Sequence, residues 1–261
     1  MEHSSNSITQ TVNYITEELG RHIVFENKST HPDAIALWII GTYLMDEWML
    51  YPKLYIHSPE RECGKTSLLC MIEAFACNAR MAASITPSAF NRIIESECPT
   101  LLIDEADRTL RGNEELNGII NAGHTKRTAI RILSEPTPDG KWKSVEMSLW
   151  APQVFAGIGT QADTLLSRSI KISMRRKMVS EKVAAAPLDY FEKQEDLRKS
   201  IKSWANQEGK SVAALDVSIP GIASDRVLDN WKPLFQIAAS LQDDWPDQVL
   251  AAFNELEVNN K

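Results

Sequence analysis

The sequence predicts an α/β fold in which helices sandwich a parallel sheet. Apolar runs that read as strands alternate with helical patterns from residue 54 to residue 174, and this alternation is typical of a parallel sheet with helices on both faces. The runs LYIH at 54–57 and TLLID at 100–104 are apolar almost throughout. Because strands of this kind are buried on both faces, we expect them near the centre of the sheet.

The composition is that of a globular domain. The chain has 261 residues, of which 43% are hydrophobic and 24% are charged, and this length suffices for one large domain with a small appendage. The formal net charge of -7 excludes a protein that coats nucleic acid by bulk charge alone. No apolar run is long enough to span a bilayer, and the polar start MEHSSNSITQ lacks the features of a signal peptide. We therefore expect a cytoplasmic protein without a membrane partner.

Helical patterns precede and separate the first strands. Residues 7–19 have the pattern of a short polar helix, and apolar residues recur at helical spacing from Pro32, which suits a helix start, to Met49. After LYIH, the stretch KTSLLCMIEAFACN reads as a helix with one apolar side. Next come a short strand near 81–84, a helix from Pro87 and the strand at 100–104.

The middle of the chain predicts a helix, a hairpin and further core strands. NEELNGIINAG at 113–123 ends in a glycine, as many helices do. TAIRIL and KSVEMSLW flank the turn-rich SEPTPDGKW, which predicts a β-hairpin at about 128–149. Core strands are expected at 153–158 and 168–174, with a helical turn at ADTLL between them.

The composition changes after residue 178, where charged residues and alanine become frequent and the patterns are helical. We therefore divide the chain into an N-terminal helical extension at 1–30, a core at 31–178 that carries the hairpin, and a C-terminal helical lid at 179–261.

The segment SPERECGKTS at 58–67 resembles a phosphate-binding loop of the form GxxxxGK[ST]. In such a loop, backbone N–H groups cradle phosphates and the lysine reaches the terminal ones. The strand before the segment and the helix after it are the context that the loop requires. Pro59 replaces the first glycine, and the expected nucleotide-binding residues are Pro59, Glu60, Arg61, Glu62, Cys63, Gly64, Lys65, Thr66 and Ser67.

The acidic end of TLLIDE at 100–105 supplies the other groups that nucleotide hydrolysis needs. Lys65 neutralises phosphate charge, and Thr66 and Asp104 are candidate ligands of Mg2+. Glu105 is the candidate that activates water. The alternative reading of Asp104 and Glu105 is a solvated turn after a strand. The expected cofactors are Mg2+ and ATP; adenine is chosen by elimination, because NKST at 27–30 lacks the aspartate of a guanine-reading motif.

The combination of HPDAIALWIIGTYLMDEW, SPERECGKTSLL, ITPSAFNRIIE, PTLLIDEADRTL and DTLLSRSIKISMRR resembles an ATPase domain of uncharacterised function in bacterial, phage and plasmid proteins, often beside primase or helicase modules. In that family SPE before CGKT is usual, so Pro59 fits, whereas Glu62 stands where glycine is frequent. The family is similar to AAA+ and superfamily 3 ATPases. The resemblance implies a P-loop NTPase of AAA+-like type and a homo-oligomer, typically a hexameric ring with active sites between subunits.

The resemblance also implies roles for three residues outside the loop. Arg168 would be a catalytic arginine finger that reaches a neighbour's nucleotide, with a surface arginine at a strand start as the alternative. Thr160 would stand at the place of a polar sensor, although the usual asparagine is absent. Arg226 would be a second, lid-borne sensor, with a helix-terminal salt bridge as the alternative.

Basic residues surround the predicted hairpin. In superfamily 3 helicases, which the chain resembles, a hairpin at this place contacts single-stranded DNA through basic residues. A solvated, charged turn is the alternative. The candidate nucleic-acid contacts are Lys126, Arg127, Arg131, Lys141 and Lys143.

These features support a ring-forming ATPase that moves along or remodels single-stranded DNA in the replication of a mobile element. The alternative is an ATP-dependent switch that binds a partner protein, in mobile-element or phage-defence biology, without moving along DNA. A third reading is an inactive nucleotide-binding scaffold, which Glu62 and the missing sensor asparagine suggest.

Overall fold

A parallel five-stranded sheet forms the centre of the molecule, with the strand order β2-β3-β6-β1-β7. The computed structural model describes residues 2–25, 30–159, 161–185, 190–220 and 224–258. The strands are β1 (Lys53–Ser58), β2 (Ala79–Ala82), β3 (Thr100–Ile103), β6 (Gln153–Ile158) and β7 (Ser169–Ser173).

The burial of the strands follows their place in the sheet. All four residues of β3 are buried, as are the first five of β6, and these strands lie inside the sheet. The edge strand β2 is only partly covered and begins two residues before the predicted strand. In register, Leu54 of β1 pairs with Val154 on one side and Ile170 on the other. The predicted parallel sheet of apolar strands is therefore confirmed.

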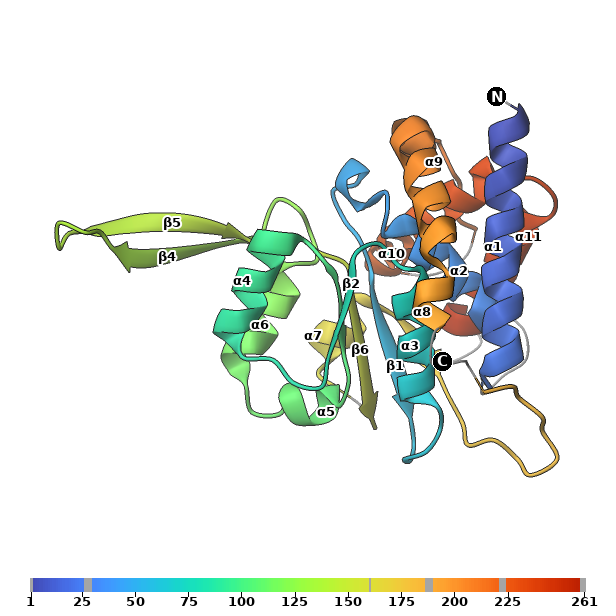
Figure 1. Cartoon of the computed structure of the whole chain (residues 1–261), viewed down its shortest axis with the longest axis horizontal. Helices are drawn as coiled ribbons and strands as arrows, with labels where there is room; N and C mark the ends of the chain where they lie inside the picture. Colours follow the sequence, from blue (N-terminus) through green and yellow to red (C-terminus); the bar gives the residue numbers. More distant parts are fainter. Residues whose placement is uncertain (1, 26–29, 160, 186–189, 221–223, 259–261) are drawn as a thin grey trace.

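Helices cover the sheet, which gives a mixed α/β fold (Figure 1). One group holds α1 (Glu2–His22), α2 (Thr30–Gly41), α3 (Lys65–Phe75) and the C-terminal helices, and α4 (Pro87–Glu97) and α6 (Glu114–Ala122) form the other. Short helices α5 (Ala106–Thr109) and α7 (Asp163–Leu166) follow β3 and β6.

The first helix is longer than the predicted polar segment at 7–19. Ile8, Val12, Ile15 and Leu19 lie three or four residues apart and are all buried, so they form a continuous apolar stripe along α1. This stripe packs against α2. The apolar spacing therefore belongs to a helix that covers another helix.

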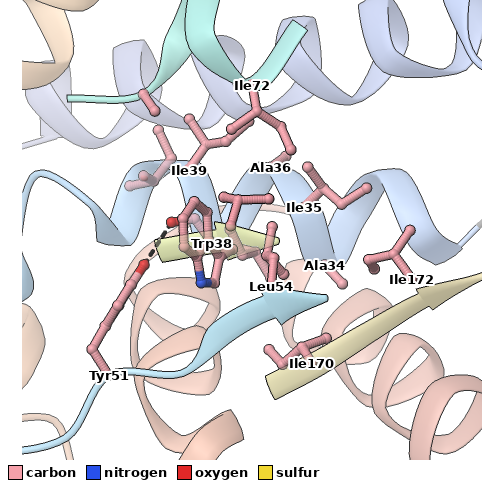
Figure 2. Packing of buried hydrophobic residues seen from close by; sticks show 14 of the residues in the cluster. Ala34, Ile35, Ala36, Trp38, Ile39, Tyr51, Leu54, Ile72, Ile170 and Ile172 are labelled. Atoms are coloured by element: carbon pink, nitrogen blue, oxygen red, sulfur yellow. Dashed lines mark hydrogen bonds between the residues drawn. The ribbon is translucent and has the colours of Figure 1, made fainter. Parts of the chain in front are cut away.

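Helix α2 is enclosed on nearly all sides, between β1 and the outer helices (Figure 2). It ends at Gly41 and not near Met49 as predicted, and a short 3-10 helix at Met45–Glu47 follows. The chain turns there because Tyr51 comes back against the end of α2, where its hydroxyl donates to the Trp38 carbonyl at 2.6 Å.

The C-terminal helices pack on the N-terminal ones. They are α8 (Tyr190–Lys193), α9 (Glu195–Ala213), α10 (Asp225–Ser240) and α11 (Trp245–Phe253), followed by a π-helical turn at Asn254–Val258. Helices α10 and α11 contact α2, and α9 contacts α1. The N-terminal extension and the predicted lid thus form one helical layer.

The segment around SEPTPDGKW forms an antiparallel hairpin of β4 (Ile130–Pro136) and β5 (Trp142–Ser148). It projects away from the body of the molecule, and only its base lies near other elements (Figure 1). Strand β5 contacts α4 there. Among the helices of the described ranges, none combines the length and the apolar character that crossing a membrane requires.

The end of α2 gives a stability prediction. A Cβ added at Gly41 would overlap the Tyr51 hydroxyl, whereas one added at Gly20 in α1 would meet no heavy atom within 4 Å. We expect Gly41→Ala to lower the free energy of unfolding by about 1–3 kcal/mol through overpacking. Gly20→Ala is the control and should raise it by about 0.5–1 kcal/mol. Urea denaturation measures both, and an unchanged Gly41→Ala variant would contradict the proposed packing.

Candidate functional site

The carboxyl ends of β1 and β3 bring two distant segments together. The loop 59–64 follows β1, Asp104 follows β3, and only β6 lies between these strands. The Thr66 hydroxyl donates to Asp104 Oδ2 at 2.8 Å. The structure therefore places these two predicted metal ligands in direct contact.

The loop turns tightly onto the start of α3. Gly64 caps this helix with φ 80°, a left-handed conformation that glycine adopts without steric cost. The Lys65 ammonium folds back over the loop and donates to Ser58 Oγ at 2.6 Å and to the Glu60 carbonyl at 3.3 Å. Cys63 is buried, and the exposed members of the predicted set are Pro59, Glu60, Arg61, Glu62, Thr66 and Ser67.

Glu62 points out of the loop. Its backbone is left-handed, with φ 63°, and 74% of its side chain is exposed. The carboxylate forms an ion pair with the guanidinium of Arg176, which follows β7. A phosphate-binding loop does not normally carry a carboxylate at the place of Glu62. Its charge is balanced here by Arg176, a residue for which the sequence indicated no role.

The two acids after β3 differ in their partners. Asp104 Oδ1 accepts from the Glu105 backbone N–H at 2.8 Å, which holds the aspartate in place. Glu105 has a left-handed backbone with φ 49°, and its carboxylate accepts from Arg108 at 2.8 Å. Its side chain is 56% exposed, so water reaches the carboxylate.

Asp107 is a further member of the site that sequence reasoning missed. Its Oδ1 accepts from the backbone N–H of Ile158 at 3.1 Å and so ties the turn after β3 to the end of β6. A Cβ at Gly157 would lie 3.1 Å from the same carboxylate oxygen. The acidic residues at 104–107 could have indicated Asp107, but the sequence does not show that the end of β6 lies beside this turn.

A cavity of about 520 Å³ opens beside the first turns of α3. Ser67, which directly follows Thr66, is part of its wall, and Lys177 and the carboxyl group of Glu73 also line it. Apolar and aromatic walls with few polar groups are typical of sites for small organic ligands. The apolar residues include Ile23, Met71 and Val183, and the ring-bearing residues are His22, Tyr190 and Phe191. The sequence indicated none of these.

Packing between distant segments builds this cavity. The His22 ring lies edge-on to Tyr190, with ring centroids 5.7 Å apart. His22 Nδ1 is 2.7 Å from the Ala184 carbonyl, and the Tyr190 hydroxyl donates to Glu18 at 2.6 Å. Burial raises the pKa of Tyr190 well above its ordinary value, so this phenol stays neutral.

Arg168 and Arg226 lie near the amino-terminal ends of β1 and β7, at the opposite ends of the strands from the loop 59–64. The Arg168 carbonyl accepts from the N–H of Lys53, the first residue of β1, and Arg226 donates to Ser167 at 3.1 Å. The length of β1 separates them from the phosphate loop by about 17 Å. Arg168 donates to the Thr164 carbonyl at 2.7 Å. The expected roles of Arg168 as an arginine finger and of Arg226 as a second sensor stay predictions. Thr160 lies outside the described residues.

The structure does not gather the basic residues around the hairpin into one patch. Lys126 donates to the Asp46 carbonyl at 2.9 Å, Arg131 pairs with Glu115 at 2.5 Å, and Lys141 pairs with Asp139 at 3.3 Å. Lys143 stands opposite Glu135 in register, and Arg127 is exposed near the base.

The hairpin instead exposes apolar side chains that the sequence did not single out. Trp142 is 71% exposed, Ile132 66% and Ile130 50%. Because the residues of β4 and β5 pair in register, Ile132 lies opposite Glu146 and Trp142 opposite Pro136. Among the residues that the structure describes, no group of three or more His, Cys, Asp or Glu side chains forms a metal site.

Comparisons with known proteins bear on the C-terminal part and on the overall arrangement. A family model described as "Protein of unknown function (DUF3631)" matches residues 173–261, which hold the C-terminal helices and not the loop at 58–67. No curated protein matches the chain.

Two solved structures are similar to the chain. They are described as "The A form apo structure of NrS-1 C terminal region-CTR" and "The A form apo structure of NrS-1 C terminal region-CTR(305-718)", with identities of 12% and 11% and TM-scores of 0.42 and 0.38. Each match covers 94% of this chain and 51% of the other. The chain thus spans about half the length of these structures, and at these TM-scores the likeness carries no functional argument.

The ion pair between Glu62 and Arg176 gives a prediction for ligand binding. With ATP as the probe of a phosphate-bearing ligand, we expect Arg176→Ala to weaken binding by roughly threefold to tenfold, because the Glu62 carboxylate beside the loop then lacks its counter-charge. Glu62→Gly should tighten binding, since it removes both the charge and the strained backbone. Calorimetric titration of the two variants and of their double variant measures this, and the double variant should return near the wild-type affinity. Weaker binding by Glu62→Gly would contradict the assignment.

Proposed function

We propose that the chain is a Mg2+-dependent ATPase of the AAA+-like P-loop type. The observation that carries the proposal is the 2.8 Å contact between Thr66 and Asp104 at the edge of the sheet where Lys65 also lies. Ligands bind at this edge of open parallel sheets, beyond the carboxyl ends of the strands.

Lys65 and the start of α3 would bind the phosphates. The ammonium is held by Ser58 and by a loop carbonyl, so it is poised at the loop and exchanges these neutral partners for phosphate oxygens. The free N–H groups at the start of α3, an 11-residue helix, add the positive end of the helix dipole.

Thr66 and Asp104 fit Mg2+, because Mg2+ prefers hard oxygen ligands and keeps several of its waters. A hydroxyl and a carboxylate already in contact would hold the ion beside the phosphates. When bound, the ion neutralises phosphate charge.

Glu105 would orient and deprotonate the attacking water. Its exposed carboxylate accepts a hydrogen bond from Arg108 at 2.8 Å. This pair would have to open when nucleotide binds, so that the glutamate can orient the attacking water. The cavity beside Ser67 would receive the adenine base between apolar and aromatic walls.

The test is ATP turnover in three variants. Lys65→Ala should lower turnover at least about 100-fold, because a phosphate-neutralising group is lost. Glu105→Gln should bind ATP but turn it over roughly 100- to 10,000-fold more slowly. The exposed Lys210 on α9 is the control, and Lys210→Ala should keep full turnover. Turnover that survives Lys65→Ala would overturn the proposal.

The finer proposal is that this ATPase acts on single-stranded DNA, as a helicase-like motor in the replication of a mobile element. The projecting hairpin with its exposed Trp142 favours it, because bases of single strands stack on exposed aromatic rings. Two of the cations on the hairpin, Arg131 and Lys141, are already ion-paired with Glu115 and Asp139, so stacking would contribute more than charge.

The hairpin gives a prediction for DNA. Trp142→Ala should weaken single-stranded DNA binding by about 5- to 100-fold, the value of one stacked base, and should leave basal ATP turnover unchanged. Val179→Ala removes another exposed apolar side chain, away from the hairpin, and serves as the control. Fluorescence anisotropy at low salt measures binding. Equal affinity of Trp142→Ala and wild type would contradict a role of the hairpin in DNA binding.

The alternative proposal is an ATP-dependent switch in a protein complex. Native mass measurement of Glu105→Gln with ATP and Mg2+, with and without single-stranded DNA, separates the two. A homo-oligomer that takes up DNA supports the motor, whereas an ATP-stabilised assembly that ignores DNA supports the switch.

A further inference from the structure

Two free cysteines lie at the amino ends of the neighbouring strands β2 and β3. Cys77 and Cys98 each come two residues before the first paired residues of these strands, Ala79 and Thr100. Neighbouring strands run about 4.8 Å apart, and a disulfide joins Cα atoms that are about 4.4–6.8 Å apart. The strand pairing therefore brings the two backbones to a spacing that a disulfide spans.

Hydrogen bonds extend this pairing to the cysteines. The Cys77 carbonyl accepts from the Thr100 backbone N–H at 3.3 Å and from the Thr100 hydroxyl at 2.6 Å. The Asn78 side chain donates to the Glu97 carbonyl at 2.8 Å. Because Cys98 lies between Glu97 and Thr100 in the chain, these bonds hold the two segments together on both sides of it.

Both cysteines line a cavity of about 240 Å³. Cys98 is exposed and Cys77 is half-buried, so a reagent from solution meets Cys98 first. Burial, and then the negative charges of Asp46 and Cys77, raises the pKa of Cys98, which places the two sulfur atoms within electrostatic reach of each other. A second cavity of about 540 Å³ shares Cys77 and Lys202 with the first, so an organic group has room beside the thiols.

Lys202 of α9 supplies a cation to this place. The acids that line the smaller cavity belong to the ion pairs Asp46–Lys126 at 3.5 Å and Glu97–Arg80 at 2.9 Å. In the part of the chain that the structure describes, no carboxylate pairs with the exposed Lys202. Burial raises the pKa of Cys77, and the Lys202 ammonium lowers it, so the cation favours the thiolate. An uncompensated positive charge of this kind attracts anionic reagents.

We propose that Cys77 and Cys98 form an oxidative modification site that reacts with a small disulfide carrying carboxylate groups. The Cys98 thiolate attacks one sulfur of this reagent, whose S–S bond breaks, and one small thiolate leaves. The Cys77 thiolate then attacks the Cys98 sulfur, the protein disulfide forms, and the second small thiolate leaves. Two protein thiols are thereby oxidised, the reagent is reduced to two small thiols, and these take up the two protons.

The test is treatment with oxidised glutathione in a Cys70→Ser background, because Cys70 is also exposed. The intact mass should fall by two hydrogens, and peptide mapping should join Cys77 to Cys98 and leave the buried Cys63 free. Cys77→Ser cannot complete the second step, so this variant should keep one glutathionyl group on Cys98. No reaction at Cys98, or a lasting glutathionyl group on Cys98 while Cys77 is present, would overturn the proposal.

Lys202→Ala tests the cation without changing either thiol. It should slow the reaction with oxidised glutathione about twofold to fivefold, the effect of one exposed ion pair, and should leave the reaction with uncharged hydroxyethyl disulfide unchanged. Lys210→Ala, on the same helix, should change neither rate. Equal rates of Lys202→Ala and Lys210→Ala with oxidised glutathione would overturn the preference for an anionic reagent.

The pH dependence of the rate is a further measurement. The thiolate is the attacking species, and burial, the largest influence on both thiols, raises the pKa of each. Asp46 raises the pKa of Cys98 further, whereas Lys126 and Lys202 oppose the shift. The rate should therefore rise as the pH increases above neutral, and a falling rate would contradict attack by these thiols. Mass and rate do not depend on ATP turnover, so failure here is distinguishable from failure of the proposed ATPase.

Discussion

The packing of α2 against the start of β1 is the constraint on which the rest of the structure depends. Trp38 is fully buried, its indole N–H donates to the Pro52 carbonyl at 2.8 Å, and its own carbonyl accepts from Tyr51 at 2.6 Å. Both partners immediately precede β1, and Figure 2 shows the contact of Tyr51 with Trp38. The helix therefore fixes where the strand begins, and the six-residue length of β1 then fixes where the loop 59–64 stands.

The common direction of the strands separates two kinds of chemistry. All pairings in the five-stranded sheet are parallel, so the groups at the carboxyl ends meet along one edge and those at the amino ends along the other. The first edge holds Lys65 together with the contacting oxygen groups of Thr66 and Asp104, on which the proposed binding of phosphates and Mg2+ rests. The second edge holds Arg168 and Arg226, whose guanidinium groups donate to the neutral acceptors Thr164 and Ser167.

Backbone strain accompanies the first edge. Glu62 and Glu105 both adopt left-handed conformations, which side chains other than glycine seldom take. Each stands in a tight turn after a central strand, and each carboxylate is paired with an arginine, Arg176 and Arg108 respectively. Strained residues gather at functional sites because the surrounding structure holds them there, and here the ion pairs supply part of that restraint.

The sequence by itself determined the parallel sheet and the strand and helix that flank the loop 59–64. Strands such as LYIH and TLLI are apolar along their whole length, and this pattern depends only on their burial. The strand–loop–helix context of Lys65 is likewise local, because backbone geometry over a few residues sets it. The length of the first helix was underestimated, because the local pattern does not reveal that its apolar stripe packs against another helix.

Only the tertiary structure decided which distant residues meet. The contact of Thr66 with Asp104, the pairing of Glu62 with Arg176, and the walls of the cavity all join segments from different strands or layers. It also placed Arg226 beside Ser167, away from the loop 59–64, and paired Arg131 and Lys141 of the hairpin with Glu115 and Asp139. Spacing along the chain specifies the residues of a loop, but the order of strands in the sheet and the packing of the helices set the distances between loops.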